Sequence, residues 1–318
     1  MSNSSGSTVL NWNATGRLVR DNVTYGVFAI VTAFFAIAAP NFATLATAEA
    51  ILRVTALVSI MAVGMSFVIV CAEIDLSVGS LASWSGMLVA MLLERGVPVL
   101  AAPLLVIVGG ALIGLVNGLL VTKLRIPSFL VTLGMLSVLS GLALTVSGTM
   151  PVPIIDTGFA DVFWNARLLG LPVPIWWTAV IVAAGYYLLH LTVYGRRVFA
   201  VGGGVVAARF SGIKSDQVKT WAFMLSGMTA SLAGLMLAAR STAGNPSLGK
   251  GLELDVIAAV IIGGTSLFGG QGSILGSLVG AIFIGILGFG LLVMGLSTSI
   301  QEIIKGAIII LAVALNRR

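Results

Sequence analysis

The sequence predicts an all-α integral membrane protein with about ten transmembrane helices. Of its 318 residues, 58% are hydrophobic and only 9% are charged, and the mean hydropathy is +1.11. Soluble domains carry about 25% charged residues, so this composition excludes a soluble surface. Apolar runs of the ~17–25 residues needed to cross a bilayer recur along the chain. We therefore expect a single membrane domain at 25–318, preceded by a polar cytoplasmic segment at 1–24.

The apolar runs define each expected helix in turn. In chain order they lie at about 25–40, 52–71, 77–93, 98–121, 128–147, 173–193, 220–240, 254–268, 273–293 and 299–315. The eighth run is short and has two interpretations. It is either a full span with a polar start at Glu253 and Asp255, or two half-helices broken at Gly263 and Gly264, which lipid tolerates only inside protein.

Positive charge sets the expected orientation, because Lys and Arg are retained on the cytoplasmic side of a membrane. With the N-terminus inside, most of the 17 Lys and Arg residues fall in connections predicted to be cytoplasmic, and both termini are cytoplasmic. The basic residues form no long tract with interleaved aromatics, so the net charge of +6 does not indicate nucleic-acid binding.

Two glycine stripes point to an internal repeat. They consist of Gly110, Gly114 and Gly118, and of Gly272, Gly276 and Gly280. Small residues at every fourth position let helices approach closely in lipid. The stripes fall on the fourth and ninth expected helices, so each half would hold five spans and the second half would be inverted, as in many transporters. The alternative is coincidence, since the chain contains 39 glycines.

Two carboxylates interrupt an otherwise apolar stretch at 51–93. Glu73 and Asp75 lie just before Ser77 and Gly79. A charge at membrane depth costs at least ~2.5–3.5 kcal/mol on insertion scales, so an intramembrane acid indicates a functional role, along a permeation path or at a partner interface. The alternative is a short cytoplasmic hairpin in which Asp75 and Ser77 cap the next helix.

The connection at 194–219 is the only long polar loop expected at the cytoplasmic face. Glycines at 202–204 form a hinge before one or two helical turns at 205–211, and Gly212 ends these turns as a C-cap. Such a short helix is suited to docking in a partner's groove. The alternative is a basic turn that contacts anionic lipid headgroups.

A glycine-rich stretch at 251–273 carries Glu253 and Asp255 at the mouth of an apolar helix and Gly263 and Gly264 near its end. Glycine-rich breaks at membrane depth commonly mark a path or a hinge. The alternative is a set of tight turns with close packing.

No enzyme or metal site is indicated. The segment 244–251 has phosphate-loop spacing, but glycine occupies the position where Ser or Thr must bind magnesium, and the segment is expected on the extracytoplasmic side. Cys71 and His190 are each the only residue of their type, so neither a metal cluster nor a catalytic triad is defensible. Lys305, in the last expected helix, snorkels or pairs with Glu302 three residues earlier.

Four segments, taken together, resemble the permease subunits of the ribose, xylose and arabinose type of bacterial ABC importer. These are 74–80 (Ile-Asp-Leu-Ser-Val-Gly-Ser), 114–134, 207–213 (Ala-Ala-Arg-Phe-Ser-Gly-Ile) and 253–272. Their order along nearly the whole chain makes the resemblance specific, where any one of them would be weak.

The resemblance implies a multi-pass bacterial inner-membrane subunit that is not itself an enzyme and holds no cofactor. It would pair with a second permease copy as a homodimer or heterodimer, engage a cytoplasmic ATP-binding subunit that holds ATP and magnesium, and receive a sugar from a periplasmic binding protein. In such permeases the cytoplasmic loop holds a coupling helix. Here its residues would be Gly203, Gly204, Val205, Val206, Ala207, Ala208, Arg209, Phe210, Ser211, Gly212 and Ile213.

The chain departs from the family pattern in two places. A Gly-Gly pair usual before Ile-Asp-Leu-Ser is Ala72-Glu73 here, which bears on substrate or gating detail. The Asn and acidic residue usual after Gly-Gly in the coupling segment are Gly204-Val205, which bears on how the coupling contact is made.

The leading hypothesis is ATP-driven uptake of a monosaccharide or close analogue. The candidates for the translocation path or its gate are Glu73, Asp75, Ser77, Gly79, Glu253, Asp255, Gly263 and Gly264. A rival hypothesis is a secondary transporter in which these acids exchange protons. A third is an ABC permease for branched-chain amino acids, nucleosides or a quorum signal.

Overall fold

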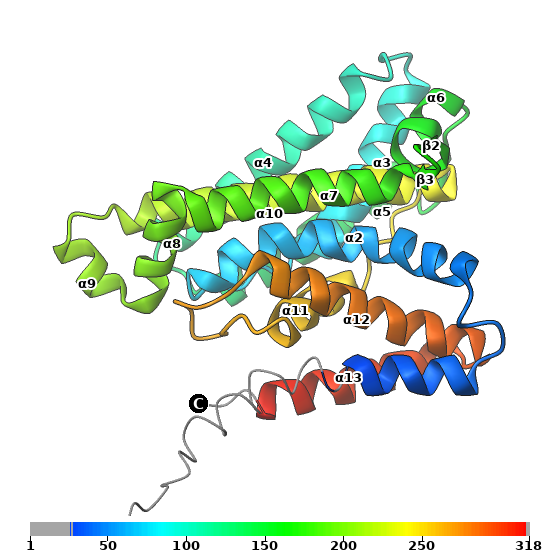
Figure 1. The fold of residues 1–318 in the computed structure, drawn as a ribbon. Helices are drawn as coiled ribbons and strands as arrows, with labels where there is room; N and C mark the ends of the chain where they lie inside the picture. The colour runs from blue at the N-terminus through cyan, green and yellow to red at the C-terminus, as the bar shows by residue number, and fades with distance from the viewer. Residues whose placement is uncertain (1–25, 27, 316–318) are drawn as a thin grey trace, which may run out of the picture.

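A computed structural model describes residue 26 and residues 28–315 (Figure 1). The predicted cytoplasmic segment at 1–24 lies outside these residues. A first helix covers Phe28–Ala38. The helices that follow are α2 (Leu45–Val70), α3 (Val78–Glu94), α4 (Ala101–Thr122), α5 (Ser128–Ser147), α6 (Thr157–Ala160), η1 (Asp161–Asn165), α7 (Val173–Tyr186), η2 (Tyr187–Leu191), α8 (Val193–Gly203), α9 (Val205–Phe210), α10 (Ser215–Ser241), α11 (Leu252–Ile262), α12 (Ile274–Val293) and α13 (Thr298–Leu315).

Short strands pair only near one end of the helix bundle. Strand β1 (Val152–Pro153) pairs antiparallel with β4 (Ala243–Gly244), and β2 (Arg167–Leu168) pairs antiparallel with β3 (Leu171–Pro172). In the described part of the chain, six helical segments are long and apolar enough to cross a membrane: Leu45–Val70, Ala101–Thr122, Ser128–Ser147, Val173–Leu191, Ser215–Ser241 and Ile274–Val293. The protein is therefore an all-α, multi-pass membrane protein.

Helices α2 and α10 form the centre of the bundle. Nearly all of the second half of α2 is buried, as is most of α10 beyond its first turns. Arg53 near the start of α2 and Arg240 near the end of α10 both stack on the ring of Trp164, so the two helices run antiparallel. We call this the Trp164 end of the bundle and the opposite end, where α10 begins, the α9 end.

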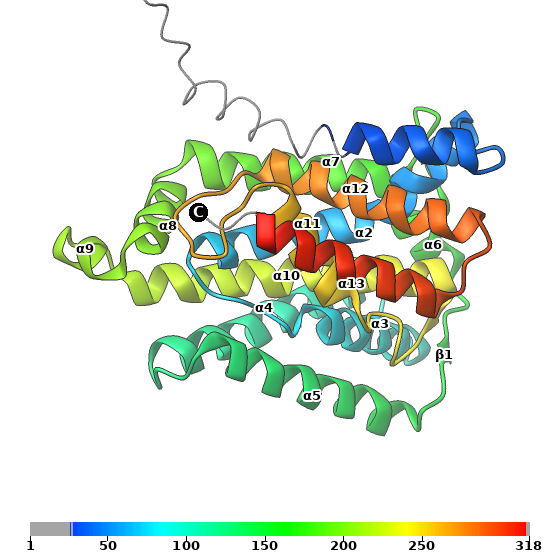
Figure 2. The same cartoon turned by 90° about the horizontal axis from the view of Figure 1, so that it is seen from below.

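Glycine stripes bring the outer helices onto this central pair. A side chain at Gly110, Gly114 or Gly118 of α4 would collide with the backbone of α10. On the other side, α12 packs against α2 and α11, where Gly276 and Gly280 contact the backbone of α11 and of the turn that ends it. Helix α4 of the first half thus packs on α10 of the second, and α12 of the second half packs on α2 of the first (Figures 1 and 2).

Two helices begin earlier than their apolar runs predict. Helix α2 begins at Leu45, because Thr44 caps it by accepting a hydrogen bond from the Thr47 amide at 3.2 Å. Helix α10 begins at Ser215, ahead of its predicted start, because its first turns carry charged residues and therefore lie outside the apolar run from which this helix was predicted. A helix can begin with polar turns as readily as with apolar ones, so an apolar run marks only part of the helix.

Neither interpretation of the eighth run is correct. Helix α11 has only 11 residues, too few to span a bilayer, and it ends at Gly263, after which Gly264 has a φ of +88°. No second half-helix follows, because residues 265–273 are irregular. Before α11, residues 242–251 form strand β4 followed by a series of turns, and this segment lies along α3.

Candidate functional site

Two breaks in the helical structure meet inside the bundle. The first break is 71–77, between α2 and α3, and the second is 242–251, between α10 and α11. A Cβ at Gly79, in the first turn of α3, would collide with the Glu253 carboxylate and lie 2.6 Å from the carbonyl oxygen of Gly249. The first turns of α3 and α11 are therefore in contact.

This contact lies deep in the bundle. Gly79 is fifteen residues before Glu94 at the Trp164 end of α3, which is about 22 Å along a helix. Ser226, which lies beside the first break, is eleven residues from the start of α10, about 16 Å from the other end. The two breaks therefore meet near the middle of the bundle, whose length along these helices exceeds the ~30 Å hydrocarbon core of a bilayer.

The first break is sealed by hydrogen bonds. Asp75 is only 1% exposed; one carboxylate oxygen accepts from the Ser77 amide (3.0 Å) and hydroxyl (2.6 Å), and the other accepts from the Ser226 hydroxyl (2.8 Å). The Asn117 amide nitrogen donates to the Ser77 hydroxyl at 3.0 Å. Asp75 thus satisfies the amide of the residue that precedes α3, and the side chain of Ser77 makes no cap of its own.

Helix α5 satisfies the backbone of the same break. The Ile74 amide donates to the Ser128 hydroxyl at 3.2 Å, and the Thr132 hydroxyl donates to the Ile74 carbonyl at 3.4 Å. Irregular backbone at membrane depth requires such partners, because lipid supplies none. Asn117, Ser128 and Thr132 all belong to the 114–134 segment, so two of the motifs that carry the resemblance contact each other.

The second break is more open. Its backbone runs antiparallel along α3, with Gly244 against Met87 and Gly249 against Gly79, and the Gly249 amide donates to the Ser83 hydroxyl at 2.8 Å. The glycines of this segment let the chain pack closely along α3.

Charged side chains remain accessible at this second break. Lys250 is exposed and Glu253 is half-buried, accepting from the Gly251 amide at 3.2 and 3.3 Å. Asp255 forms an ion pair with Lys305 of α13 at 2.8 Å. The predicted pairing of Lys305 with Glu302 is not formed.

The α9 end carries a short exposed helix. Gly204 ends α8 and opens α9, and Gly212, with a φ of +79°, follows its last turn. The boundaries predicted for this helix are confirmed to within one residue. Ala208 faces the protein, whereas Val206 and Phe210 point outward, and Phe210 is 90% exposed. An exposed aromatic residue on a charged, accessible helix is typical of a docking surface.

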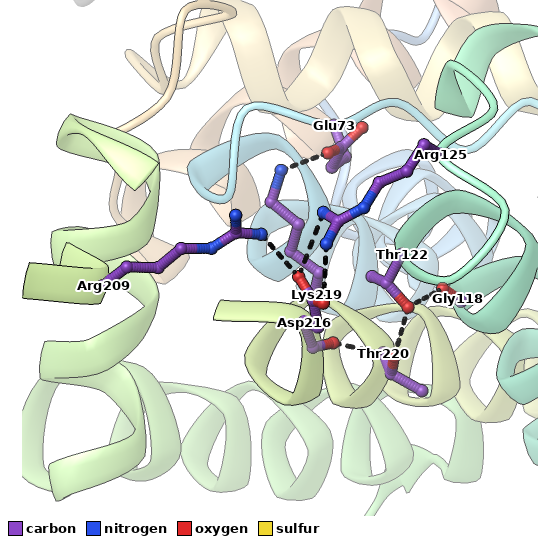
Figure 3. Close-up of polar contacts among 8 residues, drawn as sticks. All are labelled: Glu73, Gly118, Thr122, Arg125, Arg209, Asp216, Lys219 and Thr220. Carbon is purple, nitrogen blue, oxygen red and sulfur yellow. Dashed lines mark hydrogen bonds and ion pairs between the residues drawn. The ribbon is translucent and has the colours of Figure 1, made fainter. Parts of the chain in front are cut away.

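Ion pairs join α9 to the rest of the bundle (Figure 3). Asp216, in the first turn of α10, accepts from Arg209 of α9 at 2.8 Å and from Arg125 of the α4–α5 connection at 3.2 Å. One turn further along α10, Lys219 forms an ion pair with Glu73 of the first break. A continuous chain of contacts therefore leads from α9, through the first turn of α10, to the break beside Asp75.

Comparison with known proteins identifies the family of this chain. A family model described as "Branched-chain amino acid transport system / permease component" matches residues 47–313. The chain belongs to this permease family. It is 41% identical over 295 residues to the ribose import permease protein RbsC of Escherichia coli K12, covering 91% of each chain. No solved structure matches.

Other similar permeases are also named for sugars. The ribose import permease protein RbsC of Bacillus subtilis is 39% identical over 269 residues, covering 84% of each chain. The L-arabinose ABC transporter permease protein AraH of Azospirillum brasilense is 36% identical over 291 residues, covering 92% of this chain and 86% of its own. The resemblance to sugar-type ABC permeases is thereby confirmed.

The permease brings some of the predicted path residues together and separates others. Asp75, Ser77, Gly79 and Glu253 gather where the breaks meet. Glu73 lies toward the α9 end with Lys219, and Asp255 faces α13. The remaining pair, Gly263 and Gly264, lies at the far end of α11, where Gly263 contacts the backbone of α12 at Gly276.

Several contact residues were missed by reasoning from sequence. These are Asn117, Arg125, Asp216, Lys219, Ser226 and Lys250. Asn117 and Ser226 could have been found, because each is a polar residue inside a long apolar run. The charged residues in predicted loops gave no such signal. Within the described residues, no group of three His, Cys, Asp or Glu side chains could hold a metal ion.

Proposed function

We propose that this permease forms one half of the translocation path of an ATP-driven importer for a monosaccharide or close analogue. One observation carries the proposal: two broken helices begin against each other near the middle of the bundle. Discontinuous helices that meet at mid-membrane form the substrate sites of many transporters, because their free amides and irregular backbone offer polar groups there. The named relatives support a sugar as the substrate class.

The path would run along the surface formed by α3, α11, α5 and α13. This surface bears the second break, with Lys250 exposed and Glu253 half-buried. Exposed charges at such depth face water or another protein and not lipid. A second permease copy would close the path on this side, so that each chain supplies one wall.

Helix α9 would be the coupling helix. Val206, Ala207 and Phe210 project away from the protein and would enter a groove on the ATP-binding subunit, which would also bind ATP and magnesium. Movement of α9 would reach the first break through the Arg209–Asp216 and Lys219–Glu73 ion pairs. This route would replace the acidic coupling residue that the chain lacks at Val205.

The α9 end would be cytoplasmic and the Trp164 end periplasmic, in a bacterial inner membrane. This orientation places both termini in the cytoplasm and treats residues 25–318 as one membrane domain of two inverted halves. The packing of α4 on α10 and of α12 on α2, in which each half contributes one helix to each contact, supports the inverted arrangement. A periplasmic binding protein would deliver the sugar at the Trp164 end.

Uptake of labelled ribose into proteoliposomes tests this function. The permease is reconstituted with a candidate ATP-binding subunit and a candidate sugar-binding protein from the same organism. We expect uptake to require both partners and ATP at the α9 face. Uptake that persists without ATP and collapses with the proton gradient would instead establish a secondary transporter. A ligand screen on the binding protein separates sugars from amino acids, nucleosides and quorum signals.

The variant Phe210→Ala tests the coupling role. Its side chain is 90% exposed, so its loss should leave insertion and folding unchanged. We expect ribose uptake and the stimulation of ATP hydrolysis to fall at least tenfold. Leu104→Ala, at an exposed apolar position on α4, is the matched control and should retain both. Full uptake by Phe210→Ala would exclude coupling through α9.

A further inference from the structure

A basic hollow at the α9 end has no role in the proposed transport route. It has a volume of about 370 Å³ and lies between α8, the turn after α9 and the first two turns of α10. Its lining includes Tyr194, Arg197, Gly212, Lys214, Gln217 and Trp221. No acidic residue contributes to the lining, although Asp216 is adjacent in sequence.

The two cations of the hollow are unpaired among the described residues. Arg197 and Lys214 are both exposed and form no ion pair, whereas Arg125 and Arg209 nearby share the Asp216 carboxylate. Two free cations around one cavity attract an anion, and the guanidinium fork of Arg197 fits the paired oxygens of a phosphate group.

The aromatic residues place the hollow at a membrane surface. Trp221 is 55% exposed on α10, and Met228, seven residues later on the same helix face, is also exposed. Exposed Trp side chains on transmembrane helices sit at the level of lipid headgroups. Tyr194 donates its hydroxyl to the Val218 carbonyl at 3.2 Å, and burial raises the pKa of this hydroxyl, so it adds no negative charge.

We propose that this hollow binds the phosphodiester headgroup of an anionic phospholipid from the leaflet at the α9 end. Arg197 and Lys214 would contact the phosphate, Trp221 would lie at the glycerol level, and an acyl chain would follow α10 past Met228. The leaflet is cytoplasmic if the proposed orientation is correct. An ATPase subunit docking on α9 would approach from the end of the bundle, whereas the exposed residues of α10 lead from the hollow toward the bilayer.

A bound headgroup would also brace the coupling helix. Gly212 belongs both to the wall of the hollow and to the turn that ends α9. The lipid would thus hold the base of α9 against α10 from the side opposite to Asp216.

Native mass spectrometry of the purified permease tests the site without any transport partner. Phosphatidylglycerol and phosphatidylcholine with matched acyl chains are titrated separately. We expect tighter binding of phosphatidylglycerol, weakened roughly fivefold for each cation removed in the double variant Arg197→Gln/Lys214→Gln. The control Lys123→Gln/Arg196→Gln removes the same charge at exposed positions outside the hollow and should bind normally.

Four results would overturn the proposal. Equal binding of both lipids, or equal weakening in both double variants, would show only general attraction to the basic surface. Competition by millimolar inorganic phosphate would assign the hollow to free phosphate. Loss of the bound lipid when the ATPase subunit is added would assign the hollow to that partner.

The conservative variant Arg197→Lys should keep most of the affinity, which separates a local role from misfolding. Because the test needs no uptake, its failure would leave the proposed transport function untouched.

Discussion

The two breaks that meet inside this permease differ in how they are closed. In the first, Asp75 is buried and both of its carboxylate oxygens are hydrogen-bonded, and the backbone is satisfied by α5. In the second, Lys250 is exposed and the half-buried Glu253 accepts from backbone amides of its own turn. The first break is therefore a structural joint that connects to the α9 end, whereas the second presents free polar groups to the proposed path.

The contact between the breaks should show the largest effect on uptake. Gly79→Ala places a methyl group against the Gly249 carbonyl and the Glu253 carboxylate, so α3 and α11 must separate. We expect a loss of roughly 1–3 kcal/mol in unfolding free energy, or more, together with loss of uptake. Thermal unfolding in detergent measures the first quantity. Gly141→Ala on α5, where a Cβ meets no atom within 4 Å, should be nearly neutral.

The difference between the breaks can be tested with their two acids. Asp75→Ala leaves the Ser77 amide and the Ser226 hydroxyl buried without an acceptor, at about 1–3 kcal/mol for each unsatisfied group. Glu253→Ala removes one half-buried acceptor and should change stability far less while reducing the rate of uptake. Equal destabilisation by the two variants, compared by thermal unfolding and folded yield, would contradict the distinction between a sealed joint and an open wall.

The ion pair between Asp255 and Lys305 tests how firmly the second break is held. The two side chains are 15% and 23% exposed, between the limits of buried and surface pairs. Each single variant, Asp255→Asn or Lys305→Met, should lower the unfolding free energy by ~1–3 kcal/mol. The double variant should lose less than the sum of the two, and additive losses would show that the pair is not coupled.

The smallest effect on stability is expected at Asp216. Its partners Arg125 and Arg209 are largely exposed, so Asp216→Asn should cost only ~0.2–1 kcal/mol. The same variant should lower ribose uptake per ATP hydrolysed, because α9 loses its link to α10. Glu49→Gln, which breaks the exposed pair with Arg167 near the Trp164 end, serves as the control and should keep normal coupling. Normal coupling in Asp216→Asn would show that α9 acts by another route.

Local features of this permease were predictable from sequence because they depend on neighbouring residues. The apolar runs locate the six helical segments of the described chain that are long enough to cross a membrane, and Gly204 and Gly212 bound α9 to within one residue. The glycine stripes anticipated where α4 and α12 pack closely. A failure occurred where local rules compete, at the run 254–268, whose helix ends at Gly263 because Gly264 has a positive φ.

The sequence by itself determined membrane residence, the family and the position of the short helix α9, since hydropathy and ordered motifs need no knowledge of contacts. Only the tertiary structure decided that Gly79 touches the start of α11, that Glu73 pairs with Lys219 and that Asp255 pairs with Lys305. The residues of each such pair are separated by 50 residues or more along the chain, so their meeting depends on how whole helices pack. The acids that the composition singled out were thus identified in advance, while their partners followed from the packing.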